Sequence, residues 1–142
     1  MANSIMDGDV AGSIAAWIWI DTGATTSQKA IVTFTDTGSA NQYIQFDINA
    51  TASGLYNLGI GQVYNGDTQT NLLSTLHIEP GMWHLVGVIS TGTAYKLYLN
   101  GVDAGGTATA GGGGHGDWIA DTNADGELDN ITVGELLRSS GG

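Results

Sequence analysis

The chain contains no cysteine, a single proline and only three basic residues, Lys29, Lys96 and Arg138. The lack of cysteine excludes a disulfide framework and a thiolate metal site. Three basic residues against 14 acidic ones give a net charge of −11, so no basic patch is expected for nucleic acid or for an anionic membrane surface. The same charge favours cation binding wherever carboxylates cluster.

Long apolar runs are also missing. The apolar run at residues 14–20 is far too short to span a bilayer, so membrane insertion is not expected. The first 20 residues contain no Lys or Arg, which argues against a secretory signal peptide at this end of the chain.

The residues that are present favour β-structure. A length of 142 residues fits one domain, and 23 glycines with one proline fit many turns rather than a helical bundle. At residues 43–48, polar and apolar residues alternate as in a half-buried strand. Eight short strands of this kind predict a sandwich of two antiparallel sheets. The predicted strands are residues 13–20, 30–34, 42–49, 55–63, 72–78, 82–90, 94–100 and 131–137.

Three segments carry a recognisable pattern. Residues 81–89 and 95–101 read as two strands and a tight turn, because Asn100-Gly101 tolerates the positive φ that such turns require. Residues 12–20, Gly-Ser-Ile-Ala-Ala-Trp-Ile-Trp-Ile, form an aromatic strand upstream, and residues 131–134 read Ile-Thr-Val-Gly downstream.

In this order, the segments resemble the laminin-G-like domains of the concanavalin-A-like lectin/glucanase superfamily, over about residues 12–136. The resemblance implies that residues 1–142 form a single domain, or a fragment of a larger protein, with an antiparallel jelly-roll sandwich fold. Family members usually have a strand before the aromatic strand and another after Ile-x-Ile-Gly. With 11 residues before Gly12 and eight after Gly134, we expect either that one or both of these strands are lacking, or that residues 1–11 and 131–138 serve as the closing strands of a monomer.

The resemblance also implies a function. A non-catalytic recognition module is expected, which binds carbohydrate or protein ligands at the loop rim, often beside calcium, in an extracellular or cell-surface location. The alternative is a structural module that pairs through exposed sheet edges, either as a homo-oligomer or with a companion segment of a parent protein.

Residues 121–129 resemble the first nine positions of EF-hand and dockerin calcium loops. Oxygen-bearing side chains at alternate positions surround a hard cation, and Gly126 permits the sharp turn. The pattern departs at its twelfth position, which is Thr132. A solvated acidic turn is the alternative. The predicted Ca²⁺ ligands are Asp121, Asn123, Asp125 and Asp129, with Glu127 through its carbonyl.

Two loops are candidates for ligand binding at the rim. Trp118 lies in a glycine-rich loop beside the acidic turn, where it either stacks on a sugar or plugs the loop onto the sandwich. The loop at residues 61–71 is a second polar and aromatic candidate. The predicted ligand-binding residues are His115, Asp117, Trp118, Tyr64, Asn65 and Asp67.

The other tryptophans, Trp17, Trp19 and Trp83, lie in predicted strands and are expected in the core or on a sheet face. Because both faces of the strand at residues 13–20 are apolar, we expect a central strand covered on both sides. His84 follows Trp83 on an apolar strand, so a packed structural role is expected.

Catalysis is not expected. Residues 126–129 resemble the start of the Glu-x-Asp-x-Glu strand of laminarinase-type glucanases, but the next glutamate is Glu135, eight residues beyond Glu127. On a strand, that separation is roughly 26 Å at about 3.3 Å per residue, whereas a retaining glycosidase needs its carboxyl groups ~5–5.5 Å apart. A glycoside hydrolase is therefore the least favoured function.

Overall fold

The computed structural model describes residues 9–24, 28–64, 67–110, 118 and 128–134, with residues 67, 69 and 107–110 described by their backbone alone. Ten β-strands lie within these ranges. They are β1 (Gly12–Trp19), β2 (Lys29–Thr35), β3 (Tyr43–Ala50), β4 (Tyr56–Tyr64), β5 (Asp67–Ile78), β6 (Trp83–Ser90), β7 (Tyr95–Leu99), β8 (Val102–Asp103), β9 (Thr107–Ala110) and β10 (Asn130–Val133).

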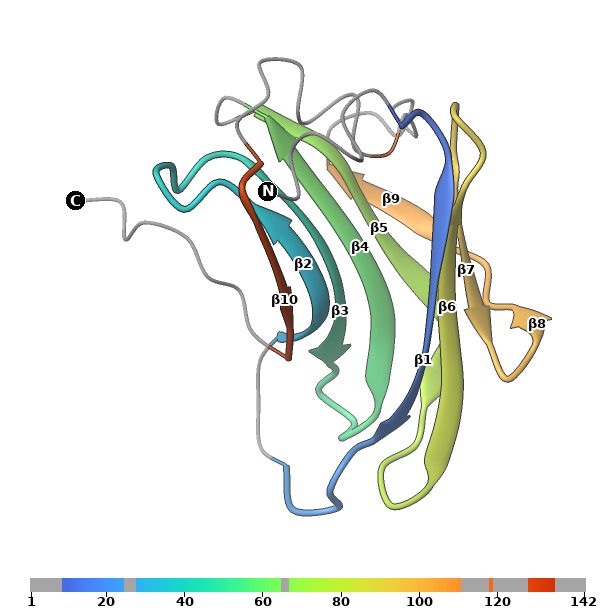
Figure 1. Cartoon of the computed structure of the whole chain (residues 1–142). Coiled ribbons are helices and arrows are strands. Elements are labelled where there is room, and N and C mark those ends of the chain that lie inside the picture. Colours follow the sequence, from blue (N-terminus) through green and yellow to red (C-terminus); the bar gives the residue numbers. More distant parts are fainter. Residues whose placement is uncertain (1–8, 25–27, 65–66, 111–117, 119–127, 135–142) are drawn as a thin grey trace.

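The strands form two antiparallel sheets that pack face to face (Figure 1). One sheet has four strands in the order β1-β6-β7-β8, and the other has six in the order β10-β2-β3-β4-β5-β9. This arrangement confirms the predicted all-β jelly-roll sandwich. In the described part of the chain, no helix is long and apolar enough to cross a membrane.

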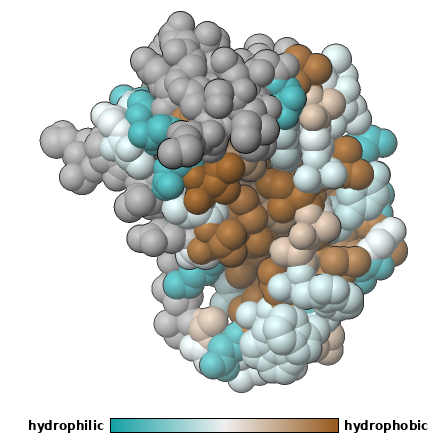
Figure 2. Space-filling model, viewed as in Figure 1, coloured by the Kyte–Doolittle hydropathy of each residue, from teal (hydrophilic) through white to brown (hydrophobic). Residues whose placement is uncertain are grey.

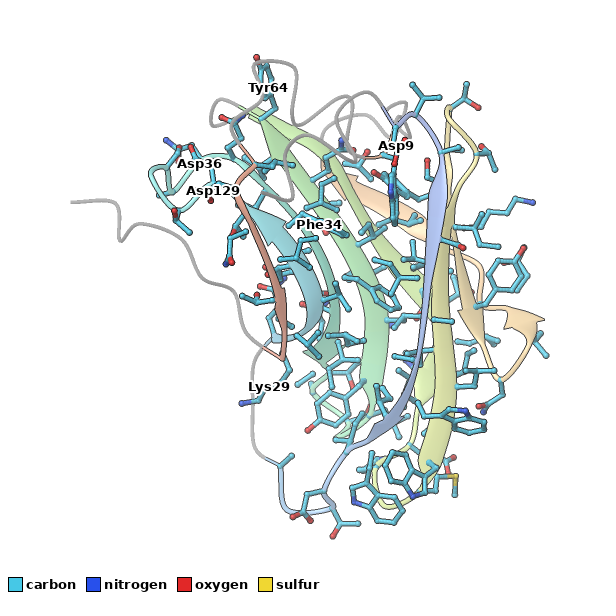
Figure 3. All side chains as sticks on the ribbon, viewed as in Figure 1. Asp9, Lys29, Phe34, Asp36, Tyr64 and Asp129 are labelled. Carbon is cyan, nitrogen blue, oxygen red and sulfur yellow. The ribbon has the colours of Figure 1, made fainter. Side chains whose placement is uncertain are left out.

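The core lies between the two sheets and follows from the alternation of residues along each strand. In β3, Ile44, Phe46 and Ile48 point inward and are buried, and Phe34 of β2 points into the same interior (Figure 3). Fully burying a side chain of this kind contributes about 1.5–3 kcal/mol. Further buried members of the core are Leu58, Ile60, Ile78, Val86, Val88, Leu97 and Leu99.

The turn between β7 and β8 has the predicted form, because Asn100 and Gly101 adopt φ values of 52° and 81°. The Asn100 side chain also joins this turn to β6. Its Oδ1 accepts a 2.9 Å hydrogen bond from the Leu85 N–H, and its Nδ2 lies 3.1 Å from His84 Nδ1. The other ring nitrogen of His84 lies 2.9 Å from the Glu79 carbonyl oxygen, which confirms the structural role predicted for this histidine.

All eight predicted strands are present, with small differences at their ends. β5 starts at Asp67 rather than at residue 72, because its polar first residues pair with the end of β4. β8 and β9 were not predicted, and β9 forms in a Gly/Thr/Ala-rich stretch by pairing with β5. Residues 135–137 of the predicted last strand lie outside the described residues.

The prediction that residues 13–20 form a central, covered strand was wrong. Among the described strands, β1 pairs only with β6 and forms the edge of the four-stranded sheet. Its outward residues, Trp17 and Trp19, are exposed. A strand with apolar residues on both faces can be a central strand covered on both sides or an edge strand with an aromatic outer face. Only the order of the strands in the sheet distinguishes the two.

Candidate recognition surface

Most of the predicted rim lies outside the residues that the structure describes. This applies to the predicted ligand-binding residues His115, Asp117 and Asn65. Tyr64 ends β4 and is half-buried, at the end of the sandwich where its label stands in Figure 3. Asp67 is the first residue of β5 and pairs with Tyr64.

Trp118 is buried, with 3% of its surface exposed. Its ring packs against Phe34 and Tyr95, with ring centroids 6.1 Å away in each case. Its carbonyl accepts a 3.1 Å hydrogen bond from Gln62 Nε2. The prediction that Trp118 stacks on a sugar was wrong, and the alternative of a plug on the sandwich is confirmed. The physical reason is the roughly 150–250 Å² that an aromatic side chain removes from water on burial.

The exposed aromatic surface lies instead on the outer face of the four-stranded sheet. Trp17, Trp19 and Trp83 are 65%, 51% and 61% exposed, and we call these three residues the tryptophan face. Trp19 pairs directly with Trp83 across β1 and β6. Their rings meet edge to face, with centroids 5.9 Å apart and planes at 62°.

The tryptophan face is not explained by packing within the described residues. Trp17 and Trp19 are two positions apart on β1, so both point away from the core. Met82, beside Trp83, is also exposed. Large apolar side chains that gather on a surface mark a binding site more often than isolated ones do, and this cluster is therefore the candidate site.

The family comparison supports a recognition role. The laminin G family model described as the concanavalin A-like lectin/glucanases superfamily matches residues 2–135. The chain belongs to this superfamily. A comparison with curated proteins found no match. Membership confirms the family predicted from the three segments, and it supports a lectin-like or recognition module in general terms.

In this laminin-G-like domain, Asp129 is the one predicted calcium ligand that the structure describes. Its two carboxylate oxygens accept hydrogen bonds from Thr37, at 2.9 Å from the backbone N–H and 2.7 Å from Oγ1. These bonds hold the pKa of Asp129 below its usual value. They tie the start of β10 to the turn that carries Asp36 (Figure 3).

The calcium site itself stays a prediction. Asp121, Asn123, Asp125 and Glu127 lie outside the described residues. Among the residues that are described, no group of three His, Asp or Glu side chains is close enough to hold a metal ion. Glu127 and Glu135, on which the prediction about hydrolysis rests, also lie outside them.

A second polar feature of the laminin-G-like domain is a buried carboxylate that the sequence analysis did not single out. Asp47 of β3 accepts hydrogen bonds from the side-chain amides of Gln28, Gln45 and Asn49. Burial raises its pKa to about 6, and the three amide bonds oppose that rise. Because these bonds engage both carboxylate oxygens, the cluster acts as a polar anchor on the six-stranded sheet.

Proposed function

We propose that the chain is a non-catalytic, extracellular recognition module that binds carbohydrate on the tryptophan face. The observation that carries this proposal is the exposure of Trp17, Trp19 and Trp83 on one side of one sheet. Its support from the family is general, because the superfamily includes lectins as well as glucanases.

The chemistry of the three rings suits a sugar chain. The face of an indole ring is electrostatically negative, so it attracts the polarised C–H groups on the flat side of a pyranose. Trp17 and Trp19 lie roughly 7 Å apart along the strand, and Trp83 sits beside Trp19 on β6. A row of this length spans more than one sugar ring, and we therefore favour an oligosaccharide or polysaccharide over a monosaccharide.

A glycan array followed by calorimetry with the best ligand tests the proposal. Replacing Trp17, Trp19 or Trp83 singly by alanine should weaken binding at least tenfold, because each substitution removes one stacking surface. The fold should survive, since all three side chains are exposed. Leu76→Ala is the matched control, because Leu76 is an exposed apolar residue on β5 of the other sheet.

Two results would contradict the tryptophan face as the site. One is an array without any bound glycan, and the other is a glycan whose affinity is unchanged in all three tryptophan variants. Release of reducing sugar from a β-glucan, with loss of that activity in Glu127→Gln, would contradict the non-catalytic part of the proposal.

Calcium is the second part of the proposed function. We infer that residues 121–129 hold one Ca²⁺, and the alternating oxygen ligands around Gly126 support this. The predicted ligands all lie in the sequence between β9 and β10.

A further inference from the structure

The sandwich has one side on which core-facing apolar residues remain exposed. On β10, Ile131 pairs with Phe34 and Val133 pairs with Val32. Directly paired residues share one face of an antiparallel sheet, so Ile131 and Val133 face the core side with Phe34. They are nevertheless 43% and 81% exposed.

The facing strand, β1, shows the same feature. Its core-facing residues Ile14, Ala16 and Ile18 pack against the core but are only partly buried. Between the two edge strands lies a cavity of about 560 Å³, and we call it the side groove. Figure 2 shows the band of apolar side chains that is open to solvent on this side. Core-facing residues that line the groove include Ala16, Ile18, Ile31, Ile48 and Val133.

The backbone of β1 borders the side groove and is a sheet edge within the part of the chain that the structure describes. Among the described strands it pairs only with β6, so the N–H and C=O groups on its other side have no strand to pair with. Natural edge strands are usually protected by charged residues, proline or short length. β1 has eight residues, none of them charged and none of them proline.

We propose that the side groove binds an extended strand from a partner protein, which pairs with β1 and places alternate apolar side chains in the groove. Strand addition of this kind uses backbone hydrogen bonds for affinity and alternate side chains for specificity. Trp17, Trp19 and Trp83 also line the groove, so a strand bound there would lie beside a sugar bound on the tryptophan face.

The charge of the molecule indicates the partner's remaining chemistry. The chain carries a net charge of −11, and Asp21 and Lys29 are the two charged residues that line the groove. A second copy would bring another −11 into contact. A strand with Lys or Arg at the outward positions is instead attracted by the field of the whole domain.

A synthetic octapeptide with alternating Lys and Val provides the probe, with affinity measured by calorimetry at physiological salt. The first control peptide has the same composition, with four Lys followed by four Val, and the second carries Glu in place of Lys. We expect the alternating Lys peptide to bind, and both controls to bind at least tenfold more weakly. Hydrogen exchange should show new protection at the β1 amides when the alternating peptide is present.

A matched pair of variants locates the site. Val133→Asp places a charge in the groove, whereas Val102→Asp places one on β8 at the other edge of the same sandwich. Both valines are exposed, at 81% and 59%, so neither change should unfold the protein. We expect a tenfold or greater loss of peptide affinity in Val133→Asp alone. Because the added carboxylate attracts Lys, this loss cannot come from long-range charge.

Three outcomes would overturn the proposal. The first is equal binding of the alternating and block peptides, or unchanged affinity in Val133→Asp. The second is a dimer in light scattering that dissociates in Val133→Asp, which would assign the groove to a second copy. The third is protection of the β1 amides in the free monomer, together with peptide binding only after residues 1–8 or 135–142 are removed. This result would assign the side groove to the ends of the chain itself.

Discussion

At the scale of single residues, Asp47 combines two opposing effects. Burial next to Gln28 and Gln45 removes the carboxylate from water and raises its pKa to about 6. The neighbouring strand accommodates it through a glycine, because a Cβ at position 59 would overlap Asp47 Oδ1. The three amide donors then compensate part of the lost hydration.

This raised pKa predicts a loss of stability as the pH rises. A carboxyl group with a pKa of 3.8 in the unfolded chain and about 6 in the folded protein keeps its proton up to a higher pH in the native state. Its stabilising contribution is present below about pH 4 and is lost by about pH 7, with a total of about 3 kcal/mol. Between pH 5 and pH 7, urea unfolding should show a fall of about 1 kcal/mol that disappears in Asp47→Asn.

Asp129 should not obscure that measurement. Its pKa is lowered by the hydrogen bonds from Thr37, so its stabilising effect is present above its unfolded pKa and is lost only as the pH falls below about 4. An equally steep profile between pH 5 and pH 7 in Asp47→Asn would show that another group is responsible.

Gly12 gives a second prediction at the residue scale. A Cβ at this position would overlap the Trp118 ring, at 2.5 Å from Nε1 and 2.7 Å from Cε2. The ring cannot easily move away, because it packs against Phe34 and Tyr95. Gly12→Ala should therefore destabilise the protein by about 1–3 kcal/mol, as overpacking does. Denaturant unfolding measures the change. Gly23→Ala is the matched control, because a Cβ there meets no atom within 4 Å.

At the scale of elements, the β7–β8 turn depends on Asn100 for its backbone and for its contact with β6. Asn100→Ala should cost about 2–3 kcal/mol, because it combines a positive φ of 52° with the loss of the side-chain bonds to Leu85 and His84. Asn100→Gly removes the same bonds but tolerates the φ, so its thermal unfolding should show a smaller loss. Equal losses in the two variants would mean that the backbone conformation contributes nothing.

The strands could be predicted from sequence because their signals are local. Alternation in β3 and the Asn100-Gly101 turn depend on residues within a few positions of each other. The order of the strands is not local, since β1 pairs with β6 more than 60 positions later. For this reason Trp17, Trp19 and Trp83 could be predicted from sequence to lie in the core or on a sheet face. Which face is exposed could not be predicted, and neither could the role of these residues as a binding site.

Trp118 illustrates the same limit in the opposite direction. The segment before it, residues 111–117, consists of glycines with one histidine and one aspartate, which favours an exposed ring. Its neighbours in space are Phe34, Gln62 and Tyr95, which come from β2, β4 and β7. No pattern within residues 111–118 indicates those contacts.

At the scale of the whole molecule, the net charge of −11 favours the binding of cations. The prediction is that millimolar Ca²⁺ raises the melting temperature, because a ligand that binds only the native state stabilises it, by about 2.7 kcal/mol at 100 times its Kd. Calorimetry should show one site, and a chelator should reverse the shift.

Asp125→Ala should abolish both the heat and the thermal shift. Asp9→Ala is the matched control, because Asp9 is an exposed acid outside the predicted loop. If both variants respond to Ca²⁺ as the unchanged protein does, the effect comes from diffuse charge and the site at residues 121–129 does not exist.

The contrast between one buried and three exposed tryptophans also makes the protein its own optical probe. A soluble quencher such as acrylamide should reach the indoles of Trp17, Trp19 and Trp83 in the native state and leave Trp118 largely shielded. Emission should therefore separate into a quenchable, red-shifted part and a protected, blue-shifted part. The first part reports on whatever covers the outer face of the four-stranded sheet, and the second reports on whether the β9–β10 connection remains attached to the core.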